Sequence, residues 1–206
     1  MDKKISAHNA PSSPPKVSHN SQQIHAGITR MAEAILDRHP DPSKLALVGV
    51  HSGGGLLVRR VEAELARLSG QSLSLDKGLV DISFYRDDWT RLTQMPALKA
   101  TDIPFDVNHR DIVLIDDVVF TGRTVRAALD AIFSLGRPDR VELAVLVDRG
   151  HREFPISPDY MGLSLPTQRH QSVNVYLFDD PLQDHATLED HKYRTLKASY
   201  NAANAK

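Results

Sequence analysis

The sequence contains no cysteine, few aromatic residues and almost no net charge. The absence of cysteine excludes a disulfide-stapled scaffold, a thiolate zinc site and a cysteine nucleophile, and it favours a cytoplasmic location. The formal net charge of -1 argues against wholesale electrostatic binding to nucleic acid or anionic membranes and leaves room only for a local basic face. The longest apolar runs, residues 45–50 and 112–115, are too short to span a bilayer, and no secretory signal is expected at the N-terminus.

The length of 206 residues and the 41% hydrophobic content suit one globular domain with tails. Residues 1–20 are rich in proline and serine and poor in large apolar side chains, so we predict a disordered tail there. The folded domain is expected over residues 21–181. A weaker helical pattern predicts a C-terminal helical tail over residues 182–206.

Apolar periodicity predicts strands alternating with amphipathic helices. Helices are expected after Gln22, after Gly54 and after Gly122, because apolar residues recur there at helical spacing. Buried strands are expected at residues 45–50, 79–86, 112–117, 141–148 and 172–179. This alternation predicts an α/β fold, with a mainly parallel twisted sheet and helices on both of its faces. The polar stretch at residues 87–108 is too long for an ordinary connection and predicts a functional loop or hairpin.

The strongest chemical signal follows the strand at residues 112–117. Asp116 and Asp117 end that strand, and two adjacent carboxylates there are a poor choice for stability alone. Residues 121–124, Thr-Gly-Arg-Thr, then open a helix and offer backbone N–H groups, two hydroxyls and a guanidinium to an anion. Carboxylates beside a phosphate cradle predict a sugar phosphate ligand at the carboxyl ends of the strands.

Residues 112–124, IVLIDDVVFTGRT, resemble the 5-phosphoribosyl 1-pyrophosphate (PRPP) signature of type I phosphoribosyltransferases. Several further blocks resemble the PyrR family, whose members are pyrimidine operon regulators and also uracil phosphoribosyltransferases. These blocks are residues 84–88, 101–107, 122–131, 144–156 and 159–167. The resemblance covers about residues 22–179 and implies that the domain at 21–181 has the type I phosphoribosyltransferase fold with a mobile hood.

The resemblance assigns roles to particular residues. It implies that Asp116 and Asp117 are catalytic. The implied PRPP and nucleotide contacts are Ile112, Val113, Leu114, Ile115, Asp116, Asp117, Val118, Val119, Phe120, Thr121, Gly122, Arg123 and Thr124. The implied pyrophosphate loop is His51, Ser52, Gly53 and Gly54, the hood is Arg86, Asp87 and Asp88, and base recognition falls to Val147, Asp148 and Arg149.

The implied reaction converts uracil and PRPP to UMP and pyrophosphate. Mg²⁺ is expected to be held mainly by PRPP and waters, with no direct protein ligand, and the protein is expected to be a homo-oligomer, a dimer or larger. One departure from the family concerns this reaction. The pyrophosphate loop has Gly53 where PyrR proteins usually carry arginine.

Two other functions are compatible with these motifs. One is a UMP-sensing, RNA-binding attenuation regulator with little or no catalysis, using Thr29, Arg30, Arg152 and Arg169 on RNA. Glu33 stands where relatives carry histidine, and an acid there would repel phosphate. The other is a purine-specific protein of the PRPP fold, against which the PyrR-like blocks argue. A P-loop NTPase is rejected, because Gly55-Leu56 replaces the required Lys-Ser/Thr after Gly54.

Overall fold

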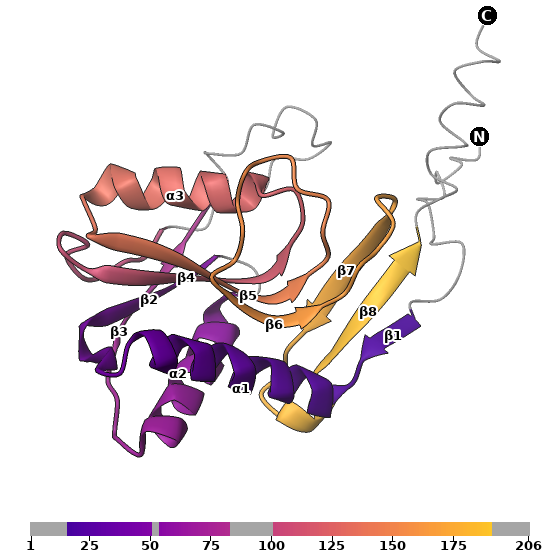
Figure 1. Ribbon diagram of the computed structural model, residues 1–206, viewed down its shortest axis with the longest axis horizontal. Helices are drawn as coiled ribbons and strands as arrows, with labels where there is room; N and C mark the ends of the chain where they lie inside the picture. The colour runs from indigo at the N-terminus through magenta and orange to yellow at the C-terminus, as the bar shows by residue number, and fades with distance from the viewer. Residues whose placement is uncertain (1–15, 51–53, 83–100, 191–206) are drawn as a thin grey trace, which may run out of the picture.

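A five-stranded parallel sheet forms the centre of the computed structural model, which describes residues 16–50, 54–82 and 101–190 (Figure 1). The strand order is β3-β2-β4-β5-β6, and every neighbouring pair is parallel. The strands are β2 (Leu45–Val50), β3 (Asp76–Val80), β4 (Asp111–Val119), β5 (Arg140–Asp148) and β6 (Tyr160–Ser164). The predicted α/β class and parallel sheet are therefore confirmed.

Helices cover both faces of this sheet, as predicted. The helices are α1 (Ser21–Arg38), α2 (Gly54–Ser69) and α3 (Arg123–Leu135). Helices α1 and α2 pack on one face and α3 on the other (Figure 1). The strand period of two explains how β4 serves both layers. Val113 and Ile115 join the cluster under α1 and α2, whereas Ile112 and Leu114 join the cluster under α3.

A second, antiparallel sheet contains the described residues 16–19 and 185–190, which belong to the two segments predicted as tails. It has the order β1-β8-β7, from β1 (Lys16–His19), β8 (His185–Asp190) and β7 (Gln171–Tyr176). Residues 16–19 are therefore a strand, and Asn20 caps α1 with its side chain. Residues 16–19 are held in place by pairing with β8, which lies close to the other end of the sequence. Ser18 Oγ also donates to the carbonyl of Ala186 in β8 at 3.1 Å. The composition of residues 1–20 alone does not indicate this pairing.

The predicted C-terminal helix is wrong over the residues that the structure describes. Residues 181–183 form a short 3₁₀ turn, η3 (Pro181–Gln183), and β8 follows directly. The other 3₁₀ turn, η1 (Pro42–Lys44), leads into β2. The predicted strand at 172–179 exists as β7, but it belongs to the second sheet. The fifth parallel strand is β6, which the periodicity missed. Residues 1–15 and 191–206 lie outside the described part of the chain.

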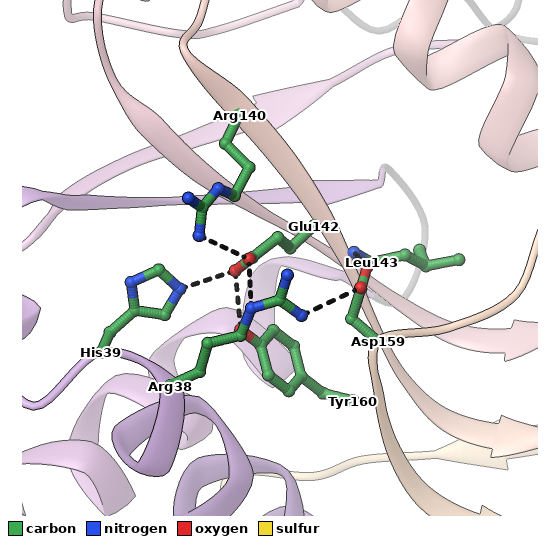
Figure 2. A network of polar contacts seen from close by, with 7 residues as sticks. All are labelled: Arg38, His39, Arg140, Glu142, Leu143, Asp159 and Tyr160. Carbon is green, nitrogen blue, oxygen red and sulfur yellow. Dashed lines mark hydrogen bonds and ion pairs between the residues drawn. The ribbon is translucent and has the colours of Figure 1, made fainter.

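A buried polar network ties the amino ends of β5 and β6 to the end of α1 (Figure 2). Its centre is the Glu142 side chain, which is only 3% exposed. Glu142 Oε2 accepts from the Tyr160 hydroxyl at 2.6 Å and lies 2.7 Å from His39 Nε2. Glu142 Oε1 lies 2.9 Å from Arg38 Nε and 3.3 Å from Arg140 Nη1. The network therefore joins three elements at the end of the sheet opposite to the motifs described above.

None of the helices among the described residues has the length and apolar content needed to cross a membrane.

Candidate active site

The motif at residues 112–124 runs along β4 from its second residue and continues into the first turn of α3. Its apolar half, residues 112–115, is buried in the core and fixes the direction of the strand. Its polar half lines a cavity of about 250 Å³, whose walls are Asp116, Val118, Val119, Phe120, Thr121, Gly122, Arg123, Thr124 and Val125. The structure therefore separates the motif into a structural part and a part that faces a ligand-sized space.

The two adjacent carboxylates occupy different environments. Asp116 lies in the cavity wall and is only 6% exposed, while Asp117 is not part of that wall. Asp116 Oδ1 accepts from the backbone N–H of Asp117 at 3.0 Å, and Asp117 Oδ1 accepts from that of Val118 at 2.8 Å. Burial, reinforced by the charge of Asp117, raises the pKa of Asp116 well above its ordinary value. Burial also raises the pKa of Asp117.

The start of α3 has features that suit an anion. Gly122 occupies the N-cap with φ of 91°, a left-handed conformation that favours glycine, and it supplies no side-chain cap. The first N–H groups of the helix are therefore left for other acceptors, although that of Arg123 makes a long 3.4 Å contact to Thr121 Oγ1. The Arg123 guanidinium was expected to contact the anion, but its Nη2 forms an ion pair with Glu153 Oε2 at 2.8 Å. Backbone N–H groups and the hydroxyls of Thr121 and Thr124 thus remain as the cradle.

The loop after β5 holds this cradle in place. The backbone N–H groups of Glu153 and Phe154 both donate to the carbonyl of Thr121, at 2.8 and 3.2 Å. Arg152 Nη1 donates to the carbonyl of Phe120 at 2.8 Å. The same guanidinium bonds the Asp148 carboxylate at 2.5 Å through Nη2. The two loops that the sequence singled out therefore form one hydrogen-bonded unit.

A second cavity, of about 320 Å³, lies at the carboxyl ends of β5 and β6. It is lined by Asp148, Arg149, Gly150, His151, Ser164, Pro166 and Thr167. Asp148 and Arg149 were predicted for base recognition and lie in its wall. Val147 was predicted with them, but it is fully buried in the core and only positions its neighbours.

The sequence did not predict the β6 side of this cavity, whose wall also contains Gly150 and His151. Gly150 and His151 both have positive φ, 77° and 65°, and His151 is not glycine, so the turn is strained. His151 Nε2 lies 2.7 Å from the carbonyl of Thr167, and its ring meets Phe120 edge-on at 5.8 Å. The block at residues 159–167 was the signal that could have located this wall.

Two glycines bring the end of β2 close to the start of α2. A Cβ at Gly49 would lie 2.9 Å from the backbone of Gly54, and the converse holds for Gly54. The turn between them therefore needs glycine at both positions. The remaining predicted residues of the pyrophosphate loop, His51, Ser52 and Gly53, lie outside the described residues. So do the predicted hood residues Arg86, Asp87 and Asp88.

The predicted RNA contacts make hydrogen bonds or ion pairs within the molecule. Thr29 Oγ1 donates to Glu64 Oε1 at 2.5 Å, and Arg30 Nη1 donates to the carbonyl of Gly162. Arg152 makes the loop contacts described above. Arg169 pairs with Glu153, close to Arg152 and far along the chain from α1.

Comparison with known proteins agrees with this geometry. The model of the phosphoribosyl transferase domain family matches residues 19–177. The Bifunctional protein PyrR of Syntrophobacter fumaroxidans is 44% identical over 174 residues, which cover 84% of this chain and 92% of that protein. The Bifunctional protein PyrR of Deinococcus radiodurans is also 44% identical, over 83% of this chain and 92% of its own.

Solved structures support the same fold. The hypoxanthine phosphoribosyltransferase of Trypanosoma cruzi, as a point mutant in a ternary substrates complex, matches with a TM-score of 0.65 and 22% identity. The match covers 84% of this chain and 94% of that one. At this identity the likeness establishes the fold alone. The sequence relatives are much closer, so the chain belongs to the phosphoribosyltransferase domain family and, within it, to the PyrR family.

Proposed function

We propose that the protein is a uracil phosphoribosyltransferase that converts uracil and PRPP to UMP and pyrophosphate. The observation that carries this proposal is the arrangement of two adjoining cavities at the carboxyl ends of β4, β5 and β6. One has an anion cradle beside a buried carboxylate, as a ribose phosphate requires. The other is of a size and polarity suited to a base, and the PyrR relatives favour uracil as that base.

The residues of the cradle would act mainly by positioning. The 5′-phosphate would lie on the N–H groups at the start of α3 and on the hydroxyls of Thr121 and Thr124. This group is remote from the reacting carbon, so its binding orients C1′ without reacting. The hydrogen bonds from Glu153 and Phe154 to Thr121 would keep the cradle rigid.

The acid pair would act electrostatically. The bond between C1′ and the pyrophosphate oxygen breaks with its electron pair leaving on pyrophosphate, and the ribose ring becomes cationic. Asp116 and Asp117 would bind the ribose hydroxyls and stabilise that charge. Because burial raises the pKa of Asp116 in the free protein, a nearby positive charge would favour its ionisation.

Magnesium would be held mainly by the oxygens of PRPP and by waters, as this hard ion often is in phosphate sites. The oxygen donors in the cavity wall, including the Asp116 carboxylate and the Thr121 hydroxyl, are compatible with such a complex. The ion would neutralise charge on the leaving pyrophosphate. We also propose a cytoplasmic location and a homo-oligomeric state of two or more subunits.

An assay with four bases tests the catalytic proposal. Purified protein is incubated with Mg-PRPP and uracil, cytosine, hypoxanthine or guanine, and nucleotide formation is followed by chromatography. We expect UMP from uracil and at least a hundredfold lower kcat/KM for each other base. Turnover of a purine with none of uracil would contradict the proposal and support the purine-specific alternative.

RNA regulation is a second candidate, because the sequence relatives are named bifunctional. In this chain the engaged side chains of Thr29 and Arg30 and the exposed acid Glu33 weigh against a phosphate-binding face on α1. We expect UMP-loaded protein to bind a pyrimidine-operon leader RNA weakly at physiological salt. Nanomolar, sequence-selective binding in a titration would instead establish the regulator.

A further inference from the structure

Arg149 is a buried cation without a carboxylate partner among the described residues. The residue is only 5% exposed, although it lies in the wall of the cavity formed with β6. Its guanidinium Nε lies 3.3 Å from Thr167 Oγ1, and its Nη2 donates to the carbonyl of Gln171. A weaker contact at 3.5 Å reaches the carbonyl of Gln168. All of these acceptors are neutral, and so is the Phe120 ring, whose centroid lies 3.8 Å from Cζ.

The neighbouring charges do not compensate Arg149, because they are already paired. The Asp148 carboxylate is bonded by Arg152 Nη2 at 2.5 Å and accepts from the N–H of Gly150 at 2.8 Å. Glu153 is shared between Arg123 and Arg169. On β4, Asp116 has a raised pKa and is therefore biased toward its neutral form.

A buried, uncompensated guanidinium is costly, and the cost falls when an anion binds beside it. Stacking on Phe120 and the neutral acceptors offset only part of that cost. Burial also lowers the pKa of Arg149, in keeping with a cation that lacks a counter-charge. The phosphate has its own cradle at the start of α3, in the other cavity. The anion that Arg149 lacks is therefore best supplied by the molecule in the second cavity.

A pyrimidine base supplies an anion at one stage of the proposed reaction. Neutral uracil carries a proton on N1, the atom that must bond to C1′. Loss of that proton to water gives an anion whose charge is spread over N1 and the two ring carbonyl oxygens. The N1 electron pair then forms the bond to C1′, while the bond from C1′ to pyrophosphate breaks with its electrons leaving on oxygen.

We propose that Arg149 stabilises the bound base as its N1 anion and so raises the fraction of uracil that is able to react. This inference rests on the proposed function and assigns the residue that activates the nucleophile. Phe120 and the contacts to Thr167 and Gln171 hold the guanidinium plane in place. Arg149 thereby links the phosphate cradle, through Phe120, to the base cavity.

Binding of two pyrimidines at one pH tests the charge preference. Uracil is neutral at pH 8, whereas 6-azauracil, a ring analogue with a more acidic N3–H, is largely anionic, with its charge spread over N3 and the same two ring carbonyl oxygens. Using one pH ensures that the two affinities are compared under the same solution conditions. Affinities are measured by calorimetry on the whole protein, with kcat/KM for uracil measured in parallel.

The wild-type protein is expected to bind 6-azauracil about tenfold or more tightly than uracil. Arg149→Gln should abolish this preference and lower kcat/KM for uracil by about tenfold to a hundredfold, with PRPP affinity changed less than threefold. Arg149→Lys keeps the charge but loses the planar stack, so it should retain part of the preference. Arg59→Gln removes one positive charge from an exposed position on α2 and should change neither quantity.

Several results would overturn the inference. One is an absence of anion preference in the wild-type protein, which needs no variant and so does not depend on how variants fold. Another is an Arg149→Gln protein that loses affinity for both ligands equally, which would make Arg149 only a structural support. If the wild-type protein turned over no uracil at all, the proposed function itself would fail, and that outcome is distinct from both.

Discussion

Replacing Glu142 should destabilise the protein by an amount that depends on which partners remain buried. The carboxylate is 3% exposed, and four side chains donate to it or pair with it (Figure 2). Arg38 and Arg140 are about half exposed, so water can solvate them when the carboxylate is gone. The His39 side chain is only 9% exposed and Tyr160 is buried, so neither has such compensation.

The magnitude follows from these two enclosed partners. Glu142→Ala leaves the Tyr160 hydroxyl and His39 Nε2 without their acceptor, and each buried unsatisfied group costs about 1–3 kcal/mol. We therefore expect a loss of about 2–6 kcal/mol in the free energy of unfolding. Glu142→Gln keeps one carbonyl acceptor and should cost about 1–2 kcal/mol. The double variant with Tyr160→Phe should show a coupling energy of about 0.5–3 kcal/mol.

The loss should also depend on pH. Burial alone would raise the pKa of Glu142, but bonds from Tyr160 and His39 and the charge of Arg38 outweigh it, so the pKa lies below its ordinary value of 4.5. The charge therefore contributes stability above about pH 4.5, and that contribution disappears as the pH falls through the folded-state pKa. The difference between wild type and Glu142→Gln should shrink in that range.

Urea denaturation at pH 7 and at pH 4, followed by circular dichroism, measures these effects. Because the network lies at the amino ends of the strands, kcat/KM of the folded Glu142→Gln protein should equal that of the wild type. A Glu142→Gln protein as stable as wild type at pH 7 would refute the reasoning. So would a difference that grows on acidification.

Three further predictions concern the site and the helix pair beside it. Asp116→Asn and Asp117→Asn should each lower kcat by about 10²-fold, with a smaller loss of PRPP affinity, which steady-state kinetics measures. Each should also raise the melting temperature of the free protein, measured by calorimetry, because burial raises both pKa values. Full turnover by both variants would show that the two carboxylates only stabilise the turn. Gly122→Ala should weaken PRPP binding and cost about 1–2 kcal/mol of stability, since alanine is strained at φ of 91°; unchanged PRPP affinity in a binding titration would exclude this cradle. The pKa of Glu64 is lowered from 4.5 to about 2, chiefly by Arg67, so its charge should stabilise the fold above about pH 4.5, and this contribution should be lost as the pH falls toward 2. The unfolding free energies of wild type and Glu64→Gln should therefore converge at low pH. A difference that stays constant with pH would contradict the ion pair.

The sequence predicted the fold class because local patterns decide it. The helical spacing of Ile24, Ile28 and Met31 corresponds to the buried face of α1. The short apolar runs correspond to strands that are buried on both faces, as β2 is along its whole length. Local patterns do not indicate which distant strands pair with one another. Strand β1 is stabilised by pairing with β8, and the residues of neither strand alone predict that pairing.

The candidate site divides along the same line. The loop at residues 121–124 could be proposed as an anion site from the sequence alone, because its N–H groups and hydroxyls belong to consecutive residues at one helix start. The cavity proposed for the base was predicted only in part, since its walls come from the end of β5 with the loop after it, and from the end of β6 with the segment after it. The relationship between Arg149 and Phe120 depends on two loops meeting in space, through the hydrogen bond from the Arg149 N–H to the Val119 carbonyl at 3.2 Å.

The two buried carboxylates of neighbouring strands explain how stability and function are separated in this sheet. Glu142 and Asp116 are similarly buried, at 3% and 6% exposure. The pKa of Glu142 is lowered, because its partners donate to it, whereas the pKa of Asp116 is raised, because burial and Asp117 disfavour its charge. A buried acid that accepts hydrogen bonds from several side chains, as Glu142 does, is stable in its charged form and serves the structure. Asp116 accepts only from the neighbouring backbone N–H of Asp117 among the described residues, which does not offset its burial, so its charged form is disfavoured until a positive charge lies nearby. The cavity beside Asp116 is where a cationic ribose would form.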